Sequence, residues 1–138
     1  MNIKASRAAI ALVLAVLATP AHADVLIQND LAAGGKATLL TVAAGKKFKL
    51  SSAVFSSGLC NGGLFSPMYR LRILRNNTAV TSNISLGSGE SLALAFAPEL
   101  VFNAGQSVAV QNLDNSSFSC LANFMLQGTT CTTGSAGC

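Results

Sequence analysis

The sequence predicts an all-β protein: a single antiparallel β-sandwich, jelly-roll-like, with about eight or nine short strands and two disulfides, following a cleaved signal peptide. The first observation behind this prediction is a repeated pattern, in which apolar residues alternate on both sides of a central glycine. Alternation is typical of half-buried strands, and glycine tolerates the positive φ of a tight corner. The three copies are Leu40-x-Val42 to Phe48-x-Leu50 around Gly45, Ile84-x-Leu86 to Leu92-x-Leu94 around Gly89, and Leu100-x-Phe102 to Val108-x-Val110 around Gly105.

The second observation is the spacing of turn residues, which separate short strand-like runs at intervals of roughly eight to twelve residues. Such spacing is common to sandwiches of the jelly-roll and immunoglobulin types. No tryptophan lies between the cysteines, because the chain has none. This weakens the immunoglobulin-like alternative, in which a buried tryptophan packs on a disulfide.

The third observation is the N-terminal segment, residues 1–23, which has the three parts of a signal peptide. Lys4 and Arg7 form a basic region, Ala8–Leu17 is apolar, and Ala21-His22-Ala23 is a cleavage motif. We therefore expect export to the periplasm, the extracellular space or the cell surface, and the short alanine-rich leader is typical of bacteria. Cleavage after Ala23 leaves enough residues for one domain.

Four cysteines in an exported chain predict two disulfides, for which three connectivities exist. We favour Cys60–Cys120 and Cys131–Cys138, which gives a sandwich domain at 24–130 and a Thr/Gly/Ser-rich, disulfide-closed tail at 131–138. The alternative joins Cys120 to Cys131 and Cys60 to Cys138. A metal site is not expected, since no two cysteines have C-x2-C spacing.

The first half of the chain begins with Val25–Ile27, a short apolar run that suits a strand buried on both faces or one that pairs with a partner chain. Asp30–Lys36 contains two glycines and predicts a turn. Ala37–Thr41 and Lys47–Val54 form the first corner unit, with Lys47 and Lys49 facing outward. Ser56–Pro67 is then a long irregular loop.

The second half opens with Met68–Asn76, whose alternation places Tyr69, Leu71 and Ile73 on one face of a strand and Arg70 and Arg72 on the other. Three further features complete the chain. Asn76-Asn77 predicts a hairpin turn into Ala79–Leu86, Pro98 is expected to divide two strands, and Phe118–Gln127 is the last strand, before an exposed tail or looped cap at Gly128–Cys138.

The composition argues against an enzyme or a cofactor protein. The only histidine, His22, lies in the expected leader, so the exported chain would lack the usual general base and metal ligand. Glu90 and Glu99 are the acid pair that a small glycoside-active enzyme would need. The simpler interpretation is that both carboxylates lie beside turns and are only hydrated by water. We expect no catalytic residue, no cofactor and no metal.

Net charge and hydropathy limit the kinds of partner that we expect for this chain. Without Lys4 and Arg7 the chain has seven basic and five acidic residues, a net charge of +2, which gives no indication of a nucleic-acid partner. After Ala23, the most apolar run, Leu92–Phe102, is interrupted by Pro98 and Glu99, so we expect no membrane-spanning helix in the exported chain. The expected partners are the chain itself or another envelope protein, and an anionic glycan.

Three groups are candidate binding residues. Leu64 and Phe65 lie in the long loop, which is either a binding loop or a crossover held by Cys60. Lys47, Lys49, Arg70 and Arg72 would form a cationic stripe for anionic glycan or lipid groups if their strands are neighbours; otherwise they solvate an outer face and guard it against aggregation. Asp114 either provides a carboxylate ligand for Ca²⁺ or only stabilises the turn in which it lies.

We therefore expect a non-enzymatic exported β-sandwich that acts as a structural or interaction module, with self-assembly as one mode. The alternative is a glycan-binding module, lectin-like or an adhesin. A small glycoside-active enzyme and a disulfide-looped inhibitor are lesser alternatives.

Overall fold

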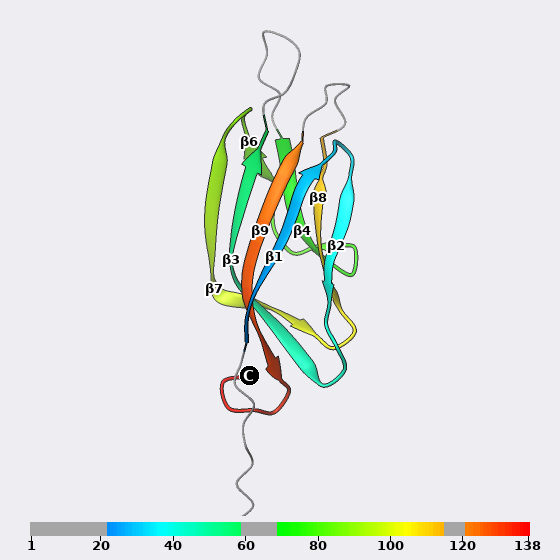
Figure 1. Ribbon diagram of the computed structural model, residues 1–138, viewed down its shortest axis with the longest axis vertical. Coiled ribbons are helices and arrows are strands. Elements are labelled where there is room, and N and C mark those ends of the chain that lie inside the picture. The colour runs from blue at the N-terminus through cyan, green and yellow to red at the C-terminus, as the bar shows by residue number, and fades with distance from the viewer. Residues whose placement is uncertain (1–21, 59–68, 115–120) are drawn as a thin grey trace, which may run out of the picture.

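The structure is a computed structural model that describes residues 22–58, 69–114 and 121–138, and these residues form nine β-strands and no helix. The strands make two antiparallel sheets, with β3, β9 and β1 lying in front of β4 and β8 in Figure 1. The order of the first sheet is β1-β9-β3-β7, and that of the second is β2-β8-β4-β5, with β6 also paired to β4. The all-β prediction is confirmed.

Strand pairing is nested along the chain: β1 pairs with β9, β2 with β8, β3 with β7, and β4 with both β5 and β6. Two further pairings, β3 with β9 and β4 with β8, join these units into the sheets. The bounds are β1 His22–Leu31, β2 Lys36–Thr41, β3 Lys46–Ser57, β4 Tyr69–Arg75, β5 Thr78–Ala79, β6 Ile84–Leu86, β7 Ser91–Asn103, β8 Ser107–Asn112 and β9 Ala122–Thr132.

The three glycine corners carry the chain from one sheet to the other. Gly45, Gly89 and Gly105 have φ of 71°, 75° and 79°, in the region that side chains with a Cβ rarely adopt. They connect β2 to β3, β6 to β7 and β7 to β8, and each of these pairs spans both sheets. The repeated sequence pattern therefore marks crossovers between the sheets.

Both sheets direct apolar side chains into one shared core. Its largest fully buried members are Tyr69 on β4 and four phenylalanines on β3, β7 and β9, namely Phe48, Phe55, Phe102 and Phe124. The rings pack in pairs, with centroids 6.1 Å apart for Phe48 and Phe102 and 5.6 Å apart for Phe55 and Phe124. Large aromatic areas removed from water stabilise the contact between the two sheets.

A bulge at Ser51 keeps the long strand β3 in phase with this core. Leu50 pairs with Gly128 of β9, whereas Ser52 pairs with the adjacent Gln127, so Ser51 is the extra residue. Leu50 before the bulge and Ala53 after it are both buried, although three positions separate them. Because strict alternation would turn Ala53 outward, the bulge restores the inward phase.

The first strand differs from the prediction. β1 has ten residues and lies at an edge of its sheet, and Val25 and Ile27 are 53% and 59% exposed. A strand buried on both faces is therefore wrong, because only the opposite face, with half-buried Leu26, contacts the core. The other possibility, pairing with a partner chain, stays a prediction.

Three other boundaries are corrected. Pro98 does not end a strand: β7 continues through it to Asn103, with a bulge between the Ala95–Ser52 and Leu100–Leu50 pairs, since an edge strand tolerates proline. The predicted strand Ala79–Leu86 is two short strands, β5 and β6. β9 extends to Thr132, because its last residues pair with β3, so the tail is shorter than expected.

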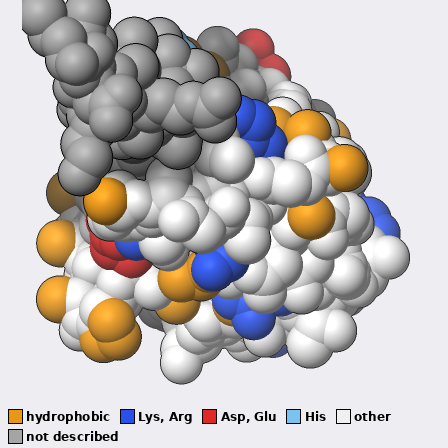
Figure 2. All heavy atoms as spheres, turned by 90° about the horizontal axis from the view of Figure 1, so that it is seen from below, with side chains coloured by type: hydrophobic (Ala, Val, Ile, Leu, Met, Phe, Trp, Pro, Cys, Tyr) orange, Lys and Arg blue, Asp and Glu red, His pale blue; other side chains and the backbone are white. Residues whose placement is uncertain are grey.

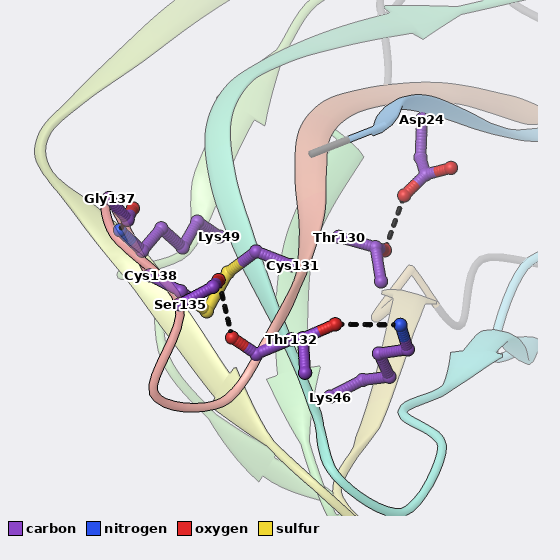
Figure 3. The surroundings of a disulfide bond; sticks show 9 residues. All are labelled: Asp24, Lys46, Lys49, Thr130, Cys131, Thr132, Ser135, Gly137 and Cys138. Atoms are coloured by element: carbon purple, nitrogen blue, oxygen red, sulfur yellow. Dashed lines mark hydrogen bonds between the residues drawn. A yellow bond between two sulfur atoms is a disulfide. The ribbon is translucent and has the colours of Figure 1, made fainter. Parts of the chain in front are cut away.

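The C-terminus is a short turn closed by the predicted Cys131–Cys138 disulfide, which excludes the alternative connectivity through Cys120 and Cys131. In the loop-entropy model a bridge this short stabilises by about 2.5 kcal/mol. Lysines of β3 hold the turn on both sides (Figure 3): Lys49 Nζ donates to the Gly137 carbonyl at 2.6 Å and Lys46 Nζ to Thr132 Oγ1 at 2.9 Å. Cys60 and Cys120 lie outside the described residues, so their pairing stays a prediction.

Gly128 is the position where this packing should tolerate least change. A Cβ there would lie 2.5 Å from the Lys49 carbonyl oxygen and would overlap the Phe48 ring. We expect Gly128→Ala to lower the free energy of unfolding by about 3 kcal/mol in urea denaturation, as overpacking does. Gly134→Ala is the control: its Cβ meets nothing within 4 Å, so only its positive φ should cost about 1 kcal/mol. Equal stability of the two variants would contradict the packing argument.

Candidate interaction surface

The outward surface of the sheet β1-β9-β3-β7 is free of charged side chains over its central rows. We call these central rows the neutral face, and they face the viewer in Figure 1. Its members are Val25, Ile27 and Asn29 on β1, Asn123, Met125 and Gln127 on β9, Ser52, Val54 and Ser56 on β3, and Ser91, Ala93 and Ala95 on β7.

The strand register sorts this face into rows. Ile27 pairs with Met125, Met125 with Val54, and Val54 with Ala93, which gives one apolar row across all four strands. The next row contains Asn123, Ser56 and Ser91, all uncharged and polar. An apolar stripe therefore lies beside a stripe of amide and hydroxyl groups.

A hollow of about 310 Å³ lies between these two rows. Its lining includes Ile27, Val54 and Met125 on the apolar side and Asn29, Ser56 and Asn123 on the polar side. This volume is at the small end of the range for ligand sites, roughly 300–1,000 Å³. The hollow can accept one apolar side chain or a small neutral group.

The rim of the hollow is shaped by a bulge in β1. The register with β9 shifts between Gln28 and Leu31, and Asp30 takes a φ of 53°. Asn123 stabilises this bulge because its Oδ1 accepts a 2.8 Å hydrogen bond from the Asp30 backbone N–H. Asn123 therefore connects the hollow to the edge strand.

The cationic side chains do not form the expected stripe. Lys47 and Lys49 are on β3 and Arg70 and Arg72 on β4, and these strands belong to different sheets and are not neighbours. In the view from the end that carries the C-terminus, Figure 2 shows lysine and arginine side chains scattered over a mostly uncharged surface. The condition on which the stripe depended is therefore not met.

Two of these four cations also have structural contacts. Lys49 contacts the C-terminal turn, as described above. The Arg72 guanidinium donates from Nε and Nη2 to Gln111 Oε1 at 3.1 and 2.9 Å, which ties β4 to β8. Anchoring within the fold accounts for both side chains.

Asp114 follows β8 and is 8% exposed. Asn112 Oδ1 accepts a 3.1 Å hydrogen bond from the Asp114 backbone N–H, which is a local contact within the turn. Nearby, burial raises the pKa of Tyr69 above 10.0, and the Asp114 carboxyl adds to the rise. Among the described residues no group of three or more His, Cys, Asp or Glu side chains could hold a metal ion.

The acid pair is separated by most of a strand. Ser91, next to Glu90, pairs with Ser56, and Leu100, next to Glu99, pairs with Leu50, which places the two acids about 20 Å apart by strand rise. Glycoside hydrolysis needs carboxyl groups within roughly 10 Å of each other. Glu90 Oε2 instead accepts a 2.6 Å hydrogen bond from the Gly87 N–H within its turn.

Leu64 and Phe65 lie outside the described residues, so the binding-loop prediction stays a prediction. The sequence-based search did not single out the neutral face. Its signal was the outward half of the alternation in β3 and β9, where serine, asparagine, valine and methionine replace the charged residues usual on a solvated face.

Comparison with protein-family models gave no match, and a search of curated proteins found no similar sequence. The described part of the chain also has no helix with the length and hydropathy to cross a bilayer. The case for function therefore depends on the geometry of the chain itself.

Tyr69 should make the fold sensitive to alkaline pH. Its folded pKa is raised, so its contribution to stability is complete below pH 10.0 and is lost as the pH rises through the folded pKa. Tyr69→Phe also removes the 2.9 Å hydrogen bond to the Gly58 carbonyl, which should cost about 1 kcal/mol at neutral pH.

We expect the Phe variant to lose less stability than the wild type between neutral and alkaline pH, measured by urea denaturation. Because Tyr69 is the chain's one tyrosine, phenolate absorbance gives its titration directly. A tyrosine that titrates at its ordinary pKa in the folded protein would contradict the prediction.

Proposed function

We propose that this chain is an exported, non-enzymatic jelly-roll domain that acts as a structural or interaction module at the cell surface or in the periplasm. The nested pairing supports the jelly-roll assignment. If β5 and β6 count as one interrupted strand, eight strands form two four-stranded sheets in the order expected for a folded-over hairpin. Because such folds host many activities, the surface must supply the function.

The observation that carries the proposal is the neutral face with its hollow. The centre of a protein interface is distinguished from other surface by its low content of charged residues. Here the central rows are uncharged, and the exposed Val25 and Ile27 lie beside a 310 Å³ hollow. Lysine and glutamate, which are among the side chains most often exposed on protein surfaces, are absent from these rows.

Two further features support export. The first 23 residues have the pattern of a leader, and the C-terminal turn is closed by a disulfide between Cys131 and Cys138. Disulfides persist in oxidising compartments outside the cytoplasm.

A photo-cross-linking amino acid at Val54, in the centre of the neutral face, tests the proposal in intact cells that export the chain. We expect covalent adducts to a second copy or to another envelope protein, identified by mass spectrometry. The same amino acid at Arg70, exposed on the other sheet, is the matched control and should give none. Equal adducts from both positions, or none from Val54, would contradict an interaction role for this face.

The hollow favours a second candidate, binding of a neutral glycan. Its polar side has two amides and one hydroxyl, Asn29, Asn123 and Ser56, which suit saccharide hydroxyl groups, while Ile27, Val54 and Met125 offer apolar contact. This differs from the anionic glycan expected from the sequence, because the cationic residues lie elsewhere.

Filling the hollow separates the two candidates. We expect Ser56→Tyr to abolish retention on a neutral glycan array if saccharides bind there, since the ring would occupy the space. Ser85→Tyr, on the exposed side of β6 in the other sheet, is the control and should retain binding. An array with no wild-type signal, or a signal that Ser56→Tyr leaves intact, would eliminate the glycan candidate.

A further inference from the structure

We propose that β1 pairs with β1 of a second copy of this chain, antiparallel, about a two-fold axis at Leu26. This inference rests on the proposed function and names the partner of the edge strand that borders the neutral face. It would join the two sheets into one, in the order β7-β3-β9-β1-β1-β9-β3-β7.

The first argument is the open edge of β1. Among the described residues, β1 pairs with β9 along one side, and no strand of the sheet lies along its other side. From Val25 to Asn29 this edge has neither a charged residue nor a proline. Proteins that keep an edge unpaired usually protect it with such residues.

The opposite edge of the same sheet has that protection. β7 carries Pro98 and Glu99, both exposed, within its bulge. Pro98 has no N–H to donate and the bulge interrupts the ladder, so β7 is a poor template for strand addition. The two edges of one sheet differ, and β1 is the one suited to pairing.

The second argument is the register. An antiparallel pair about Leu26 places Val25 opposite Ile27 of the second copy, and Asp24 opposite Gln28. Val25 and Ile27 both point outward, so the symmetry gathers four β-branched side chains into one apolar cluster across the joint. It also keeps the two Asp24 carboxylates apart. A shift by one residue would oppose outward and inward side chains and is excluded by the pleat.

The third argument is charge. The chain is net positive, but β1 and β9 contain no lysine or arginine, since the cations from Lys36 onward lie on β2, β3 and β4. The two-fold axis brings together β1 and β9 of both copies. Two copies can therefore approach along this edge without opposing cations.

The paired sheets would place both hollows on one continuous surface. Ile27 borders the hollow and lies one residue from the two-fold axis, so each hollow adjoins the joint. This arrangement is isologous, because the same strand serves on both copies and the contact closes at a dimer.

Light scattering with size exclusion on the chain recovered from the periplasm of an expressing bacterium tests the proposal. We expect a concentration-dependent dimer, which Val25→Lys with Ile27→Lys should weaken by roughly a hundredfold because like charges then oppose one another. Leu92→Lys on β7, 38% exposed in the wild type, is the control and should dimerise normally. Val25→Thr with Ile27→Thr keeps β propensity and should weaken the dimer less.

Each variant must show the wild-type thermal transition, and the Thr pair provides the test if the Lys pair does not fold. A chain that stays monomeric at high concentration, or a dimer that the Val25 and Ile27 changes leave intact, would overturn the proposal.

Oxidative cross-linking tests the register itself. Directly opposed residues have the Cα separation that a disulfide needs, roughly 4.5–5.5 Å. A mixture of Val25→Cys and Ile27→Cys chains should therefore give a 25–27 cross-link, located by peptide mass spectrometry, in higher yield than either variant alone. A preferred cross-link between two identical positions would overturn the axis at Leu26.

The two proposals can fail separately. If photo-cross-linking from Val54 captures another envelope protein while the purified chain stays monomeric, the pairing of two copies is wrong and the interaction role remains. If neither experiment gives a contact, both proposals are wrong.

Discussion

The structure depends on the requirement that both sheets direct their large apolar side chains into one shared core. β3 shows how strict this requirement is. It supplies Phe48 and Leu50, then Ala53 and Phe55, and only the bulge at Ser51 allows all four to point the same way. Gly128 on β9 completes the arrangement, because the Phe48 ring occupies the space that a side chain would need. Burial of aromatic area therefore sets the register of three neighbouring strands.

The outward surface follows from the same register. Once inward positions are fixed, the alternate residues of β1, β9, β3 and β7 must form the opposite face. In the central rows of this sheet those residues are valine, isoleucine, methionine, alanine, serine, asparagine and glutamine, so the neutral face carries no charge, whereas Lys47 and Lys49 lie outward at the end of β3 near the C-terminal turn. Several cations instead have structural contacts: Lys46 and Lys49 hold the C-terminal turn and Arg72 links β4 to β8. The division between an uncharged face and anchored cations motivates both proposals made above.

Only part of the candidate surface could be predicted from the sequence. Alternation correctly placed Lys47, Lys49, Arg70 and Arg72 away from the core, since it depends on the residue and its immediate neighbours. It could not show that the two pairs belong to different sheets, which depends on contacts between residues far apart in the chain. For the same reason the hollow was missed: its lining comes from β1, β3 and β9, which no local pattern brings together.

The sequence by itself determined the all-β class, the three positive-φ corners, the inward set on β4 and the pairing of Cys131 with Cys138, because each depends on local chemistry or short separation. The tertiary structure alone decided which strands are neighbours, that β1 is an exposed edge and that β7 passes through Pro98 without ending. The physical reason is that the partners of a strand are selected by the total burial of apolar side chains over the whole domain. The sequence of one strand, with its alternation of apolar and polar residues, does not contain that information.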